Sequence, residues 1–149
     1  MKPIKYLILA FISFSYCPIS FPQDSSNLYK KLYRLVLPRA KQGDVQSQFN
    51  LGKMYQQGLG VSKDLQKAAE WARFAANQGH FRAQFFLAER YGKGQGVPKN
   101  LVKAYKWLNL ASSQGYKPAI HDRNRLAKKM TMLQIKKAEQ FSKHWKSKK

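Results

Sequence analysis

The chain has 149 residues, which suits one domain, and its 28 Lys and Arg against 7 Asp and Glu give a formal net charge of +21. Its single cysteine, Cys17, excludes an internal disulfide and a thiolate metal site. A positive field of this size attracts a polyanion or an acidic partner, although a surface that only keeps the chain in solution is the alternative.

Residues 1–20 have the layout of a secretory signal peptide. Lys2 and Lys5 form a short basic start, and the apolar run over 6–14 is too short to span a bilayer. Cleavage is expected between about residues 15 and 22, and the residues before Cys17 are not small enough to favour a lipid anchor. We therefore expect export to the periplasm or secretion, with an uncleaved, membrane-tethering segment as the alternative.

After a short polar lead-in over 21–27, the chain repeats itself with a period of 36 residues. A shift of one period places residues 55–64, YQQGLGVSKD, on residues 91–100, YGKGQGVPKN. A fixed period of this size marks a stacked repeat architecture. The glycines of 91–100 have the spacing G-x-G-x-G. This spacing matches neither of the nucleotide-binding motifs G-x-G-x-x-G and G-x-x-x-x-G-K-[ST]. They therefore predict a recurring turn and not a phosphate loop.

Within one period the apolar spacing predicts two short helices joined by a turn. Leu51 and Tyr55 belong to the first helix of the first copy. Gly58 and Gly60 suit the positive φ that ends this helix and turns the chain. Asp64, and Asn100 one period later, stand where a side-chain oxygen caps the second helix. The predicted unit is helix–turn–helix.

The two copies resemble the Sel1-like repeat, a relative of the tetratricopeptide repeat. The shared pattern is A/S-Q-x-x-L-G-x-x-Y-x-x-G-x-G-V-x-x-D/N-x-x-K-A-x-x-W-x-x-x-A-x-x-Q-G, and it runs over 47–79 and 83–115. The resemblance implies an all-α solenoid with repeats at 44–79 and 80–115. It further implies a bacterial interaction or adaptor protein, and nothing in it implies catalysis.

The ends of the array resemble partial repeats that close the stack. Residues 28–43 resemble a second helix, and residues 116–147 resemble a first helix followed by a C-terminal capping helix. Thr131 and Gln134 form a capping-box start for this last helix. Terminal units must be atypical because they cover the open ends of the core. The expected fold is a helix-pair solenoid of about two and a half units with a C-terminal cap.

The acidic residues and histidines predict no catalytic or metal site. The seven acidic residues are scattered, and Asp44 and Asp64 stand at helix starts, where they serve as caps. No carboxylate pair suits general acid–base work, and the three histidines lack metal-binding spacing. We expect no enzyme and no cofactor, and the absence of such groups disfavours a cell-wall hydrolase. No nucleic-acid-binding motif is present, so no nucleic acid is expected as a partner.

The tryptophans and the first helices suggest where the core and a binding face lie. Trp71 and Trp107 recur in phase with alanines, which is typical of core positions. The first helices of tetratricopeptide-like solenoids line a concave groove, so the resemblance implies a groove stripe on this chain. The stripe is basic and consists of Phe49, Lys53, Gln56, Arg82, Phe85, Glu89, Lys93, His121, Arg125 and Lys128. Phe49 and Phe85 either anchor a partner or simply pack between repeats, and both alternatives are open.

These features together predict a non-catalytic protein–protein interaction module of the bacterial cell envelope or secreted fraction. An acidic protein partner is expected in the basic groove, and no stable membrane span is expected after signal cleavage. The alternative is a binder of envelope polyanions, such as glycans or lipid head groups, through the net positive surface.

Overall fold

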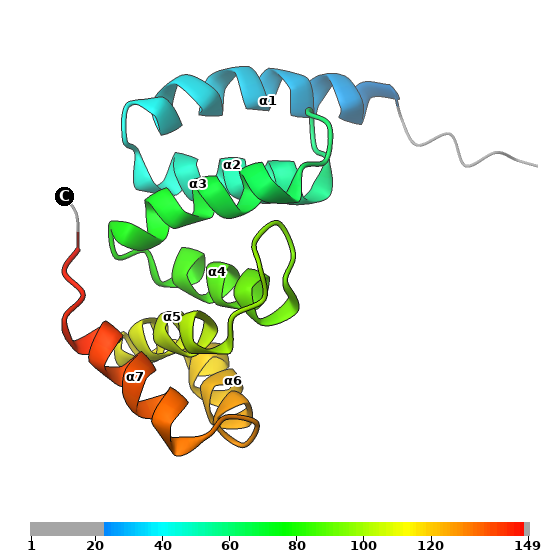
Figure 1. Ribbon diagram of the computed structural model, residues 1–149. Helices are drawn as coiled ribbons and strands as arrows, with labels where there is room; N and C mark the ends of the chain where they lie inside the picture. Colours follow the sequence, from blue (N-terminus) through cyan, green and yellow to red (C-terminus); the bar gives the residue numbers. More distant parts are fainter. Residues whose placement is uncertain (1–22, 148–149) are drawn as a thin grey trace, which may run out of the picture.

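The computed structural model describes residues 23–147, and within that range it holds seven α-helices and no strand. The helices are α1 (Gln23–Lys41), α2 (Val45–Gln57), α3 (Leu65–Asn77), α4 (Phe81–Lys93), α5 (Leu101–Ser113), α6 (Lys117–Ala127) and α7 (Met132–Lys143). Figure 1 shows them stacked in chain order, from α1 at one end to α6 and α7 at the other. From α1 to α6 each helix packs on the next one along the chain, and α7 packs back onto α5.

The two ends of the chain differ in what the structure describes. The expected signal peptide over 1–20 lies outside the described residues. Helix α1 begins at Gln23 and so overlaps the expected lead-in over 21–27. Within residues 23–147 no helix is both long enough and apolar enough to cross a membrane.

The predicted helix caps are confirmed. The Asp44 carboxylate accepts a hydrogen bond from the Ser47 N–H at 2.8 Å and starts α2. Asp64 starts α3, and Asn100 accepts from the Lys103 N–H at 2.9 Å to start α5. The Thr131 and Gln134 capping box is also present at the start of α7. These side chains satisfy backbone donors that the first turn of a helix leaves unpaired.

The glycine turns are confirmed, and they pack on the preceding unit. Gly60 has φ 71° and Gly96 has φ 74°, which are left-handed values that favour glycine. A Cβ on Gly60 would overlap the Tyr29 carbonyl of α1, and a Cβ on Gly96 would overlap the Leu65 carbonyl of α3. Because Tyr29 lies one period before Leu65, α1 stands in the stack as the second helix of a preceding unit.

Small side chains and glutamine pairs hold the two helices of each unit together. Ala68, Ala72 and Leu51 are fully buried, and a Cβ on Gly52 would lie only 3.0 Å from the Ala68 carbonyl oxygen. Helices α2 and α3 therefore pack at close range. A glutamine pair then recurs with the period: the side-chain amide of Gln78 donates to Gln48 at 2.8 Å, and that of Gln114 donates to Gln84 at 2.9 Å.

The two tryptophans differ in burial. Trp107 is 5% exposed in the central cluster, and Trp145 contacts it with ring centroids 6.4 Å apart, so its predicted core position is confirmed. Trp71 is only half-buried and packs beside Phe74. The core prediction for Trp71 is therefore only partly right. Helix α7, which is followed by Trp145, packs on α5 and covers Trp107. Among residues 23–147 no corresponding helix packs on α3, so Trp71 is left partly exposed.

Candidate binding groove

The structure places the ten predicted groove residues on or just after the first helix of each unit. Helix α2 carries Phe49, Lys53 and Gln56, helix α4 carries Arg82, Phe85, Glu89 and Lys93, helix α6 carries His121 and Arg125, and Lys128 follows α6 directly. These side chains do not form one continuous patch. Five of them line two neighbouring pockets, and the other five lie elsewhere on these helices.

The first pocket, called the basic pocket below, lies between α2 and α4 and has a volume of about 540 Å³. Its lining residues are Lys53, Gln56, Gln57, Lys63, Leu65, Arg90, Lys93 and Gln95. Four of these carry a positive charge and none is acidic. Lys53 and Arg90 both lie over the ring of Phe86, 5.4 and 4.9 Å from its centroid. The pocket therefore gathers four positive side chains, and two of them also contact the buried ring of Phe86.

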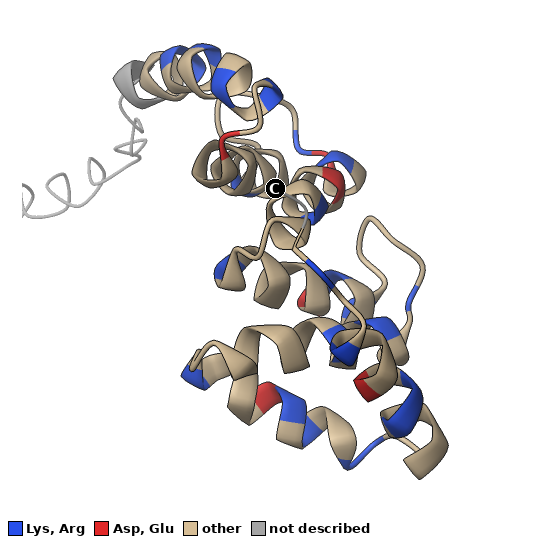
Figure 2. Cartoon of the chain, turned by 90° about the vertical axis from the view of Figure 1, so that its left-hand side faces the viewer, with Lys and Arg blue, Asp and Glu red and all other residues tan. Residues whose placement is uncertain are grey.

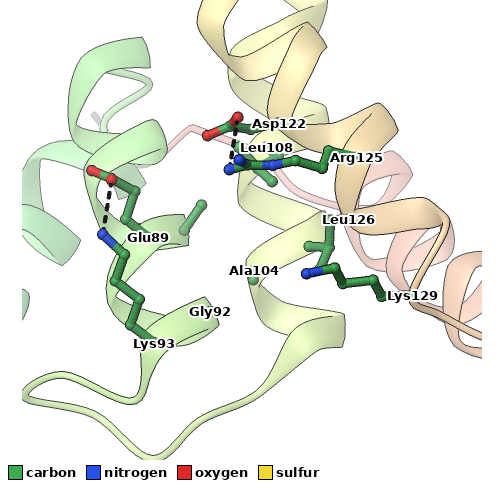
Figure 3. A pocket seen from close by; sticks show the side chains of 10 residues that line it. Glu89, Gly92, Lys93, Ala104, Leu108, Asp122, Arg125, Leu126 and Lys129 are labelled. Carbon is green, nitrogen blue, oxygen red and sulfur yellow. Dashed lines mark ion pairs between the residues drawn. The ribbon is translucent and has the colours of Figure 1, made fainter.

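The second pocket, called the mixed-charge pocket, lies between α4, α5 and α6 and has a volume of about 280 Å³ (Figure 3). Glu89 and Lys93 pair across one side at 3.5 Å, and Arg125 pairs with Asp122 on the other side at 3.1 Å. Leu108 belongs to its apolar part. Because both pairs are partly exposed, they order the rim but contribute little to stability.

The two pockets occupy the same place in successive units. Gln56 of the first pocket is one period before Gly92 of the second, and Arg90 is one period before Leu126. Lys93 lines both pockets. The repeat architecture has therefore made one surface feature twice, with different side chains in each copy.

Phe49 and Phe85 make contacts between units. The Phe49 ring lies 4.8 Å from the ring of His80 and 6.4 Å from that of Phe86, while Phe85 lies 5.4 Å from Tyr116. Both are partly buried. These contacts are those of the packing alternative, and an additional role as partner anchors stays a prediction.

The remaining predicted residues lie outside the pockets. Arg82 is exposed with its guanidinium over the ring of Phe81 at 5.5 Å. His121 is exposed and contacts Asp122 at 3.1 Å, and Lys128 is exposed at the end of α6. Figure 2 shows lysine and arginine positions distributed along the whole stack, so these three add to a general positive surface.

His80 caps α4 in place of the Asp44 that caps α2. Its Nδ1 atom accepts a hydrogen bond from the Ala83 N–H at 3.1 Å, which requires a neutral ring with Nδ1 unprotonated. Burial lowers the pKa of His80, and the nearby positive charge of Arg82 lowers it further. Both effects keep the ring neutral, and the neutral ring makes a serviceable cap.

Sequence reasoning missed Arg90, Lys63 and Asp122 as members of this region. The repeat itself holds the signal for Arg90, because residues one period away are Met54 and Leu126. An arginine at a position that is apolar in both neighbouring units departs from the pattern. In the part of the chain that the structure describes, no three His, Cys, Asp or Glu side chains gather into a group that could hold a metal ion.

The protein-family model described as Sel1 repeat matches two segments of the chain, residues 45–80 and 81–116. The chain contains two Sel1 repeats. A sel1-like repeat-containing protein of Acanthamoeba polyphaga mimivirus is 37% identical over 79 residues, which make up 51% of this chain and 15% of the viral protein.

Two solved structures are similar to this Sel1-repeat chain. One is a protective antigen present in uropathogenic Escherichia coli strains, which displays an SLR fold; it has a TM-score of 0.78 and 38% identity over 81% of this chain and 26% of its own. The other is a Sel1 repeat protein from Oxalobacter formigenes, with a TM-score of 0.62 and 35% identity over 69% of this chain and 42% of its own. This chain spans less than half the length of each of these relatives. The predicted all-α repeat solenoid is confirmed, and Sel1 repeats generally act as protein-interaction modules.

Proposed function

We propose that this chain is a non-catalytic protein–protein interaction module of the bacterial cell envelope or secreted fraction. An acidic segment of a protein partner binds along the first helices, over the basic pocket and the mixed-charge pocket. The observation that supports this most directly is the basic pocket, in which Lys53, Lys63, Arg90 and Lys93 line one space without an acidic residue. Phe49, Gln56, Glu89 and the other predicted groove residues would lie under or beside the bound segment.

Charge complementarity makes an acidic partner the best fit. A groove of one sign raises the local concentration of a ligand of the other sign and accelerates encounter. Lys93 connects the two pockets, so one extended segment reaches both. The mixed-charge pocket offers an apolar wall at Leu108 and Leu126 for an uncharged side chain of the same segment.

The second candidate function is binding of envelope polyanions, such as glycans or lipid head groups. The observation that favours it is the formal net charge of +21 together with the spread of positive positions beyond the groove (Figure 2). Binding of this kind depends on total charge, falls steeply as salt rises, and does not depend on which lysine is removed.

The two candidates are separated by charge removal at two places. The full chain is used to capture proteins from an envelope extract at stepwise salt, in comparison with Lys53→Gln plus Lys93→Gln. The matched control is Lys30→Gln plus Lys136→Gln, which removes the same charge from exposed positions on α1 and α7. Groove binding predicts at least about a tenfold loss of affinity for the groove variant alone, because charges at an interface act locally.

Equal losses in the two double variants would favour the polyanion candidate. Capture that is unchanged in the groove variant, at any salt concentration, would contradict the proposed groove. The lysines are a cleaner probe than the phenylalanines, because Phe49 and Phe85 also contact neighbouring units and their removal would loosen the stack.

A further inference from the structure

Arg90 is a buried cation that has no counter-charge among the described residues. It lies in the last turn of α4, is 4% exposed, and its Nε atom has no hydrogen-bond acceptor among the described residues. None of the ion pairs within residues 23–147 includes its guanidinium. Arginine stays charged at any ordinary pH, and a buried charge that lacks a counter-charge costs free energy.

The repeat register shows that packing does not require an arginine here. Met54 stands one period earlier and is also 4% exposed, and Leu126 stands one period later and is half-buried. The position is therefore an apolar, inward-facing position of the first helix. At Arg90 the chain carries a charge at a position that is apolar in both neighbouring units, and this charge lies over the ring of Phe86.

The surroundings of Arg90 present donors to a common space. Arg90, Lys53 and Lys63 line the basic pocket together with Lys93, whose other contact is the exposed pair with Glu89 at 3.5 Å. The Gln56 Oε1 atom in the same pocket is buried without a donor among the described residues. The oxygen and nitrogen of an amide exchange places by rotation, so a rotated Gln56 would direct its N–H groups into the pocket.

We propose that the basic pocket is a carboxylate-binding subsite, in which the Arg90 guanidinium receives one carboxylate of the acidic segment bound along the first helices. This inference rests on the proposed function and deepens it. A guanidinium presents a planar fork of N–H donors that matches the two oxygens of a carboxylate, and such pairs are stronger where water is excluded. The lysines at the rim attract the segment, while the buried arginine selects the point at which it docks.

The probe is the peptide N-acetyl-hexaglutamate amide, and its binding to the full chain is measured by isothermal titration calorimetry at low salt. Arg90→Met is compared with the control Arg34→Met, which removes the same charge from an exposed position on α1 outside both pockets. We expect Arg90→Met to weaken binding at least about tenfold and Arg34→Met to change it less than about twofold. The melting temperature of Arg90→Met is expected to stay level or rise, because methionine is the residue of the preceding unit.

Several results would overturn the proposal. Equal losses in Arg90→Met and Arg34→Met would show general attraction to the positive surface. A lower melting temperature with undiminished peptide affinity would make Arg90 a structural residue. A rise in melting temperature with inorganic phosphate but not with hexaglutamate, dependent on Arg90, would show a phosphate site in place of a carboxylate site.

Arg90→Lys keeps the test decisive if the methionine variant does not fold. Lysine retains the charge but lacks the planar fork, so we expect several-fold weaker peptide binding, and unchanged binding would refute the paired geometry. The envelope capture with Lys53 and Lys93 variants does not involve Arg90. If the Lys53 and Lys93 variant loses capture as expected but Arg90→Met binds hexaglutamate normally, the subsite alone is refuted. If the Lys53 and Lys93 variant captures as well as the unaltered chain, the proposed function itself is refuted.

Discussion

Replacing Gly96 with alanine tests how one unit rests on the next. Gly96 has φ 74°, and a Cβ there would overlap the Leu65 carbonyl at the start of α3. The left-handed conformation costs a residue with a side chain about 1–2 kcal/mol. The overlap involves backbone on both sides, so the loop has to move, which costs a further ~1–3 kcal/mol. Gly96→Ala should therefore lower the free energy of unfolding by about 2–5 kcal/mol.

Gly115→Ala is the matched control. Gly115 has φ 81° but a Cβ there would meet nothing within 4 Å, so only the conformational cost applies. The loss of chain entropy in the unfolded state is the same for both substitutions and cancels in the comparison. Gly96→Ala should exceed Gly115→Ala by about 1–3 kcal/mol, which is the part due to contact with α3.

Urea unfolding followed by far-UV circular dichroism measures both changes, provided that the slope with denaturant stays constant. In a domain of this size each kcal/mol corresponds to a shift of roughly 4 °C in melting temperature. Equal destabilisation by the two substitutions would mean that the turn at Gly96 does not rest on α3. Gly60→Ala offers an internal repetition, because its Cβ would overlap the Tyr29 carbonyl in the same way.

Two further predictions concern the core and the cap of α4. Trp107→Ala should cost about 3–5 kcal/mol in thermal or urea unfolding, and Trp71→Ala clearly less because it is only half-buried; equal costs would contradict the assigned burial. The pKa of His80 is lowered by burial from its ordinary value of 6.5, so its stabilising contribution is present above about pH 6.5 and is lost as the pH falls through the lowered value. The melting temperature should therefore fall as the pH is lowered below about 6.5. The variant His80→Asn keeps a capping oxygen that does not titrate, so its melting temperature should fall less over the same pH range. Identical pH profiles of the two proteins would rule out the His80 cap as the cause.

Features that depend on local chemistry could be predicted from the sequence. The caps at Asp64 and Asn100 and the turns at Gly58 and Gly96 follow from what a helix end requires, whatever surrounds it. The period then carries each of them from one unit to the next. The buried position of Trp107 was predictable for the same reason, since alanines in phase with it mark the inner face of the second helix.

Features that depend on how units meet could not be predicted in the same way. The periodic pattern assigns Phe49 and Phe85 to the stripe opposite the partner helix, but it does not give the distance to the next first helix. That distance brings Phe49 against His80 and Phe85 against Tyr116. Trp71 shows the same limit. Helix α7 packs on α5, which carries Trp107, whereas among the described residues no corresponding helix packs on α3, which carries Trp71. Trp71 therefore stays partly exposed.

The two pockets show how a repeat with one backbone plan forms surface pockets with different linings. Phe86 of α4 packs on Ala68 and Ala72 of α3, and Lys53 and Arg90 of the basic pocket lie over its ring. One period later Asp122 stands in place of Phe86, and Gly92 stands where the first unit has Gln56. A Cβ on Gly92 would meet nothing within 4 Å, so the space of the mixed-charge pocket exists because these side chains are small or polar. The positions that keep the period build the solenoid, and the positions that break it give each pocket its own lining.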